Sequence, residues 1–227
     1  MTPAEIARLI DHTLLKPEAT REDVERMCQE ALRFEFASVC VNARYAAQVA
    51  EALHGSAVKT CVVVGFPLGA TLTSVKVFET NEALRLGARE IDMAIAISAL
   101  KSGDDAAVES EIRAVTEVAH QGGAIDKIII EAGLLTEGEK MRACKAAVSA
   151  GVDFVKTSTG FGHGGATVED VRLIRRAVGA KIGVKASGGI RSLHDCLQML
   201  AAGATRIGTS SGVNIVEEAR TATNGKT

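Results

Sequence analysis

The chain has 227 residues, of which 47% are hydrophobic and 24% charged, as is usual for a folded globular domain. Its net charge of -2 and aromatic content of 3% disfavour nucleic-acid binding, which relies on basic surfaces and base-stacking rings. No apolar run approaches the roughly 18 residues of a membrane span. From the charge, the aromatic content and the apolar runs together, we expect neither nucleic acid nor a membrane as a partner.

Apolar, β-branched runs alternate with longer helical patterns along the whole chain. The expected strands cover Ile10–Leu15, Ser38–Asn42, Lys59–Phe66, Glu90–Ala96, Lys127–Ala132, Phe154–Thr159, Lys181–Ser187 and Arg206–Ser211. Several are apolar at nearly every position, which is typical of a parallel sheet that is buried on both faces.

Helices are expected between these strands. Thr20 is a predicted helix N-cap, because Asp23 follows it at the spacing of a capping box and an apolar stripe begins at Val24. Similar start signals recur at Thr136, Thr167 and Ser192. Helix ends are predicted at Gly87, Gly151, Gly179 and Gly203, because glycine accepts the left-handed backbone that ends a helix.

About eight such strand–helix units predict a single α/β domain over residues 1–227, a (β/α)8 or TIM barrel with a short N-terminal helix. A doubly wound open sheet is the main alternative. That fold usually has about five or six strands, and the chain has no GxGxxG turn after its first strand. The polar tail from about residue 219 to residue 227 is expected to fray.

The cysteines and histidines form none of the common metal or redox motifs. The five cysteines are far apart and include no CxxC pair, which predicts free thiols and a reducing, cytoplasmic location. The histidines form no HxH or HExxH motif, so we expect neither a metal nor a cofactor. His163, which lies in a predicted loop, is interpreted as a solvated residue.

Two lysines stand at the ends of neighbouring strands, Lys156 in FVKTSTGFG and Lys185 in VKASGGIRS. Functional residues of a (β/α)8 barrel lie at such strand ends, and neighbouring strands are about 4.8 Å apart. Because two ammonium groups at that range repel, one lysine is expected to stay charged and the other to be a neutral nucleophile toward a carbonyl. In the alternative interpretation, Lys156 reaches solvent or belongs to a buried ion pair.

Asp92 is the only charged side chain in the run IDMAIAI. A lone carboxylate in a strand commonly pairs with a structural cation. Together with two lysines in the same barrel, however, Asp92 is a candidate general acid or base.

Glycine-rich turns follow the last three strands: STGFG (Ser158–Gly162), SGGIRS (Ser187–Ser192) and GTSSG (Gly208–Gly212). Ordinary turn chemistry explains any one of them. Three together, where this fold commonly binds phosphate, predict a phosphorylated ligand. With the lysines they predict carbonyl chemistry through a Schiff base, and aldol cleavage and formation fit best.

The chain resembles the deoxyribose-phosphate aldolase family over nearly its whole length. The motifs that carry the resemblance include IDHTLLKPEAT, SVCVN, VGFPLGA, EIDMAIAISALK, KTSTGF and KASGGIR. The resemblance implies a class I aldolase that interconverts 2-deoxy-D-ribose 5-phosphate with D-glyceraldehyde 3-phosphate and acetaldehyde. It also implies that the protein is a homodimer and uses no cofactor.

The resemblance further implies roles for individual residues. It places the Schiff base on Lys156, an assisting role on Lys185 and proton transfer on Asp92. It implies that Asp11, Thr13 and Cys40 line the pocket. The residues implied at the phosphate are Thr159, Gly160, Gly188, Gly189, Gly208, Ser210 and Ser211. The chain departs from many members at Ala96, where those members have an asparagine.

Two alternatives remain open from the residues themselves. One is another Schiff-base barrel enzyme, such as a transaldolase-like or keto-acid aldolase, which would use a different carbonyl substrate. The other is a silent phosphate-binding barrel whose lysines hold an anion, which would bind sugar phosphates without any covalent adduct.

Overall fold

In the computed structural model, which describes residues 1–162 and 164–224, the strands close into a parallel barrel. Within those residues it has eight strands in chain order: β1 (Ile10–Leu14), β2 (Ser38–Val41), β3 (Lys59–Val64), β4 (Glu90–Ala94), β5 (Ile125–Ile129), β6 (Phe154–Lys156), β7 (Gly183–Ser187) and β8 (Arg206–Thr209). Each strand pairs with the next, and β1 also pairs with β8. The predicted (β/α)8 fold is confirmed, whereas His163 lies outside the described residues.

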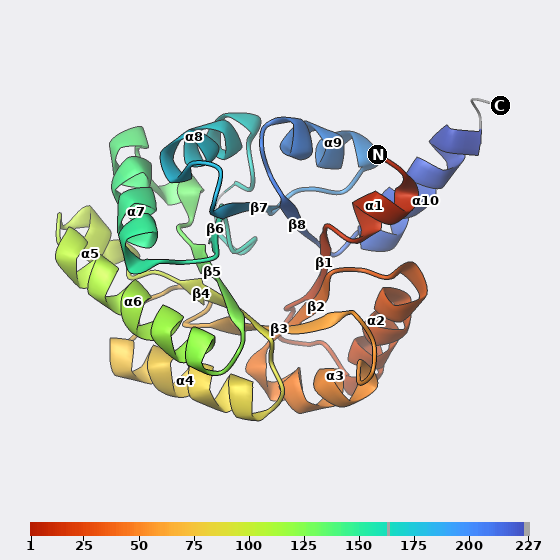
Figure 1. The fold of residues 1–227 in the computed structure, drawn as a ribbon, viewed down its shortest axis with the longest axis horizontal. Helices are drawn as coiled ribbons and strands as arrows, with labels where there is room; N and C mark the ends of the chain where they lie inside the picture. The colour runs from red at the N-terminus through yellow and green to blue at the C-terminus, as the bar shows by residue number, and fades with distance from the viewer. Residues whose placement is uncertain (163, 225–227) are drawn as a thin grey trace.

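Helices surround the strands (Figure 1). They are α1 (Pro3–Ala7), α2 (Arg21–Phe34), α3 (Ala46–Ala52), α4 (Thr73–Arg85), α5 (Ile97–Lys101), α6 (Asp105–Gln121), α7 (Glu137–Ala150), α8 (Val168–Val178), α9 (Leu193–Ala201) and α10 (Gly212–Asn224), with 3-10 turns at Ala43–Tyr45 and Ala132–Leu134. The expected N-terminal helix is α1, which packs against α10. None of the described helices combines the length and the apolar character that crossing a membrane requires.

The predicted helix starts agree with the capping geometry. The side chains of Thr20, Thr136, Thr167 and Ser192 each accept a hydrogen bond from the backbone N–H three residues later. These bonds satisfy donors that a helix start otherwise leaves without a partner.

Boundaries differ from expectation mainly at strand ends. β6 ends at Lys156 rather than Thr159, and β4 ends at Ala94 rather than Ala96, because the chain leaves the ladder there to form loops. Residues of the expected frayed tail up to Asn224 belong to α10. Ala219 is buried in the core, and this contact helps to hold the helix in place.

The inside and the outside of the barrel wall differ in chemistry. Side chains such as Val39, Ile91 and Ile128 alternate outward and pack in the core beneath the helices. The inward positions instead hold fully buried charged groups, including Lys127 and Lys185. Because the interior of this fold is usually filled by branched apolar side chains, a charged interior indicates a functional centre.

Candidate active site

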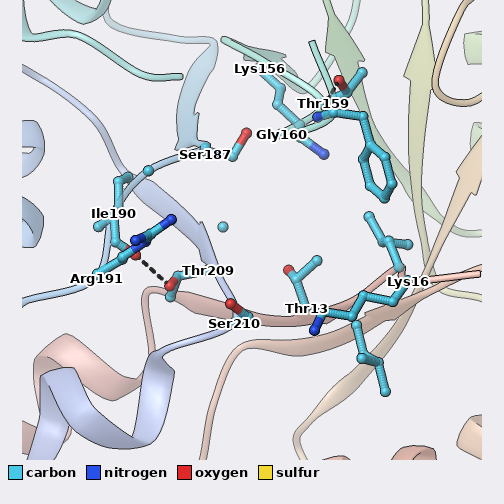
Figure 2. A pocket seen from close by; sticks show the side chains of 16 residues that line it. Thr13, Lys16, Lys156, Thr159, Gly160, Ser187, Ile190, Arg191, Thr209 and Ser210 are labelled. Carbon is cyan, nitrogen blue, oxygen red and sulfur yellow. Dashed lines mark hydrogen bonds between the residues drawn. The ribbon is translucent and has the colours of Figure 1, made fainter. Parts of the chain in front are cut away.

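A cavity of about 420 Å³ opens at the carboxyl ends of the strands. Lys156 and Thr159 lie on one side of it, and Thr13, Lys16 and Ser210 lie opposite (Figure 2). The described lining residues include the cations Lys16 and Arg191 but no aspartate or glutamate. The cavity is therefore electrostatically suited to an anionic ligand.

Lys156 ends β6, and its amine is directed toward the cavity (Figure 2). Its Nζ donates a hydrogen bond to Oδ2 of Asp92 at 2.8 Å and lies 6.0 Å from the ring centroid of Phe66. The side chain is almost fully buried yet lines the cavity. A ligand in the cavity can therefore reach this amine.

Lys185 shares the Asp92 carboxylate with Lys156. The two residues are register partners across β6 and β7, as the sequence predicted. The Lys185 Nζ is 2.6 Å from Oδ2 of Asp92 and 2.5 Å from Oδ2 of Asp11. Burial disfavours the charged form, but these carboxylates outweigh it and raise the pKa of Lys185 above its ordinary value.

Gly208 leaves the space that Lys185 occupies. A Cβ atom at Gly208 would lie 2.8 Å from Cε of Lys185, closer than such contacts allow. Gly208 also lines the cavity. The same residue therefore leaves space for the Lys185 side chain and forms part of the cavity wall.

Asp92 joins three lysines. Its Oδ1 accepts a hydrogen bond from Lys127 at 2.8 Å, while its Oδ2 accepts from Lys156 and Lys185. Burial opposes ionisation, but the lysines outweigh that penalty and hold the pKa of Asp92 well below its usual range. The carboxylate is therefore ionised and holds the three amines together.

A second tier of charges lies deeper in the barrel and was missed in the sequence. Lys127 is 2.7 Å from Glu90, and Arg206 is 2.6 Å from Asp11 and 3.1 Å from Glu90. The available signal was spacing, since Glu90 is two residues before Asp92 and therefore faces the same side of β4. Nothing in the sequence shows that the Lys127 side chain contacts both Glu90 and Asp92.

The buried network has as many cations as carboxylates when Lys156 is left out of the count. Among the described residues it contains the carboxylates of Asp11, Glu90 and Asp92 and the cations of Lys127, Lys185 and Arg206. A protonated Lys156 would give these buried groups a net positive charge. Of the three lysines bound to Asp92, Lys156 is the one that lines the cavity.

The expected phosphate end of the cavity forms at the turns after β6, β7 and β8. Thr159, Gly160, Gly188, Gly189, Gly208 and Ser210 line it, as expected, whereas Ser211 does not. Gly188 and Gly189 have φ of 89° and 80°, a left-handed conformation that glycine adopts readily and that can aim backbone N–H groups at an anion. Lys16 and Arg191 are cationic lining residues that the sequence reading missed.

Glu131 supports the loop after β6 from below. Its Oε2 accepts hydrogen bonds from the backbone N–H of Thr159 at 3.1 Å and from the Thr159 hydroxyl. Glu131 has φ of 51°, which is uncommon for a residue other than glycine. The sequence places this glutamate within the expected strand Lys127–Ala132, two residues beyond the observed end of β5.

Two expected pocket residues lie behind the cavity wall. Asp11 is fully buried beneath Lys185, so its contribution is to the ion network. Cys40 is also fully buried, where it packs with Leu15, Cys61 and Val63. Thr13 alone of the three lines the cavity.

Comparison with known proteins agrees with this geometry. A family model described as DeoC/LacD family aldolase matches residues 6–218. The chain belongs to the DeoC/LacD aldolase family. The matched part of this aldolase contains every described strand and all the cavity residues.

Individual relatives of this DeoC/LacD aldolase are similar over almost their whole length. A deoxyribose-phosphate aldolase of Geobacillus sp. strain WCH70 is 58% identical over 212 residues, covering 93% of this chain and 95% of the relative. A deoxyribose-phosphate aldolase from Thermococcus gammatolerans is 56% identical, covering 98% of this chain and 100% of the relative. The tetrameric structure of deoxyribose phosphate aldolase from Aeropyrum pernix superposes with a TM-score of 0.92 at 35% identity, covering 97% and 93%.

Proposed function

We propose that this aldolase cleaves 2-deoxy-D-ribose 5-phosphate to D-glyceraldehyde 3-phosphate and acetaldehyde, and catalyses the reverse addition, through a Schiff base on Lys156. Deoxyribose-phosphate aldolase activity follows from the similarity to relatives that bear this name. The observation that carries the lysine assignment is position, because Lys156 is the one lysine bound to Asp92 that lines the cavity.

In the first stage the neutral Lys156 amine adds to the aldehyde carbon of the open-chain sugar. Loss of water then gives an iminium ion, which withdraws electrons from the bond to be broken. Lys185, which stays charged because two carboxylates hold its proton, is placed to donate toward the departing hydroxyl.

In the second stage the bond between C2 and C3 breaks as the C3 hydroxyl loses its proton. D-glyceraldehyde 3-phosphate leaves, and the two-carbon fragment remains on Lys156 as an enamine. Protonation and hydrolysis of the enamine release acetaldehyde and the free amine. Asp92 holds Lys156 and Lys185 on one carboxylate oxygen, so that a proton can move between them during these steps.

The substrate phosphate is assigned to the glycine turns. Gly188, Gly189 and Ser210 line that side of the cavity, and Arg191 adds a positive charge. Backbone N–H groups and a guanidinium are donors well suited to phosphate oxygens. This placement leaves the aldehyde end of the sugar free to reach Lys156.

Borohydride trapping tests the reaction. We expect acetaldehyde plus borohydride to leave a reduced two-carbon adduct on the Lys156 peptide, located by mass mapping. Lys181→Ala, which removes an exposed lysine before β7, is the matched control and should still be modified. Trapping by pyruvate or dihydroxyacetone phosphate instead of acetaldehyde would indicate a different aldolase, and binding without any adduct would indicate a phosphate-binding protein.

We also propose that the protein is a homodimer. Leu68, Leu72 and Phe78, at 73%, 71% and 67% exposure, come from α4 and the loop before it. Apolar surface of this kind is commonly covered by a partner. Size-exclusion chromatography with light scattering should give twice the chain mass, and Phe78→Glu should shift it toward the monomer, whereas a monomeric native protein contradicts the proposal.

A further inference from the structure

Two buried thiols face each other beside the ion network. Cys40 on β2 and Cys61 on β3 are register partners, and both are fully buried. Neighbouring strands lie about 4.8 Å apart, within the Cα separation of about 4.4–6.8 Å that disulfides span. The two sulfur atoms and a carboxylate oxygen of Asp92 all lie within 4.8 Å of one another. The two side chains are therefore positioned to form a bond with each other.

The surroundings favour thiol chemistry over metal binding at this place. Cys40, Cys61 and Asp92 together offer a ligand set for a metal ion. Lys127 and Lys156, however, each place an ammonium or amine nitrogen 2.8 Å from the Asp92 carboxylate. The charged Lys127 and Lys185 would repel a divalent cation, whereas they favour a thiolate.

A small reagent in the cavity is separated from the thiols by one layer of side chains. Leu15 lines the cavity and belongs to the same buried cluster as both cysteines. Phe66 packs against the same cluster. A small neutral oxidant therefore has a short route to the thiols when Leu15 changes its rotamer.

We propose that Cys40 and Cys61 are an oxidation site, at which a hydroperoxide such as hydrogen peroxide forms a disulfide that inactivates the enzyme. The Cys40 thiolate attacks one peroxide oxygen, the O–O bond breaks, and water leaves after a proton is taken up. The sulfur of Cys61 then attacks the Cys40 sulfenic acid, the S–O bond breaks, and a second water leaves with the Cys61 proton. Two thiols are oxidised and one peroxide is reduced to two waters.

The order of the two cysteines follows from their surroundings. The contact with Cys61 is the main factor that lowers the pKa of Cys40, while burial raises the pKa of Cys61 well above its ordinary value. Cys40 is therefore the thiol that forms a thiolate more readily and attacks first.

The effect on turnover follows from the contact of Cys61 with Asp92, and this part rests on the proposed function. The Cys61 thiol donates to Oδ1 of Asp92 at 3.2 Å and accepts from Lys127 at 3.4 Å. A disulfide sulfur has no hydrogen to donate, and bond formation draws Cys61 toward Cys40. Asp92 then loses a donor and shifts relative to the two lysines that it aligns.

Peroxide treatment followed by peptide mapping tests the proposal. After oxidation, thiols are blocked with N-ethylmaleimide in denaturant, and the cleavage rate is measured with and without dithiothreitol. We expect a peptide cross-linked through Cys40 and Cys61, a fall in turnover of about tenfold or more at full conversion, and recovery with dithiothreitol. Each variant is compared with its own untreated sample.

Two variants sharpen the result. Cys61→Ser should form no cross-link and should keep its turnover after the peroxide treatment. Cys196→Ala, which removes another buried thiol, on α9, should oxidise like the native protein. A sulfinic acid on Cys40 without a cross-link, a cross-link to another cysteine, or a Cys40–Cys61 cross-link without loss of turnover would overturn the proposal. If the reduced protein cleaves no deoxyribose phosphate, the proposed function fails, and the cross-linked peptide alone decides whether the pair is an oxidation site.

Discussion

Lys156 and Lys185 are register partners that donate to the same carboxylate oxygen, Oδ2 of Asp92, at 2.8 and 2.6 Å. They nevertheless differ in their other contacts. Lys185 also contacts Asp11 and lies beneath the cavity surface, whereas Lys156 lines the cavity. This asymmetry supports the proposal that Lys185 keeps its proton and that Lys156 is the reactive amine.

Lys156→Ala is expected to abolish turnover while leaving stability nearly unchanged. The buried charges balance without Lys156, so its removal leaves no carboxylate without a cation. Cleavage of deoxyribose 5-phosphate and the urea midpoint check the two parts of this prediction. Near-normal cleavage would refute the nucleophile assignment, and a large loss of stability would refute the charge balance.

Lys185→Leu is expected to slow turnover and to move the acidic limb of the pH–rate profile to higher pH. The reason is that the variant lacks the positive charge that opposes protonation of the neighbouring amine. A pH–rate profile of kcat/KM measures the effect, and Lys181→Leu, at an exposed position, is the control. An unchanged profile would mean that the two lysines are not coupled.

Lys127→Met is expected to lower the free energy of unfolding by about 3–5 kcal/mol, because Glu90 and Asp92 lose their shared cation. Adding Glu90→Gln to the Lys127→Met variant removes one unpaired negative charge and should restore part of the lost free energy of unfolding. Urea unfolding of both single variants and the double variant completes the cycle. Additive effects in the double variant would show that these charges do not act as one network.

Glu131→Ala is expected to raise KM for deoxyribose 5-phosphate about tenfold, which corresponds to one charge-assisted hydrogen bond. The loop after β6 would lose the acceptor that holds Thr159. Glu131→Gln, which keeps an acceptor oxygen, should restore most of the affinity. Unphosphorylated deoxyribose is the control substrate, and an equal rise in its KM would argue against a role at the phosphate.

The pH dependence of stability is expected to contain a contribution from Asp126, which is buried beneath α6 and β6. Burial raises the pKa of Asp126 to about 6, against 3.8 for its unperturbed value. The folded state therefore binds more protons between these values, and the stabilising contribution present below about pH 4 is lost as pH rises through 6. The difference is worth about 3 kcal/mol.

Urea unfolding at pH 4.5 and 7.5 checks this contribution. Asp126→Asn cannot titrate, so the difference in its unfolding free energy between the two pH values should change relative to the native protein. Glu117→Gln, which removes an exposed carboxylate on α6, is the matched control. Equal pH dependence in all three proteins would exclude Asp126 as the source.

Local patterns in the sequence were sufficient to predict much of the fold. Strand composition, the capping residues Thr20 and Thr136 and the repeated unit length predicted a barrel, because these signals reflect local backbone preferences. The shared depth of Lys156 and Lys185 was also predictable, since both end a strand just before a Ser/Thr–Gly turn. The chain itself thus determines the barrel and the pair of strand-end amines.

The tertiary structure alone decided which charges meet and which of them the ligand can reach. Lys127, Glu90 and Arg206 come from three strands, and only the register of the closed barrel brings them to Asp11 and Asp92. Barrel closure likewise placed Asp11 and Cys40 behind the cavity wall. Charge balance and accessibility depend on distances between residues far apart in sequence, and local backbone preferences do not contain those distances.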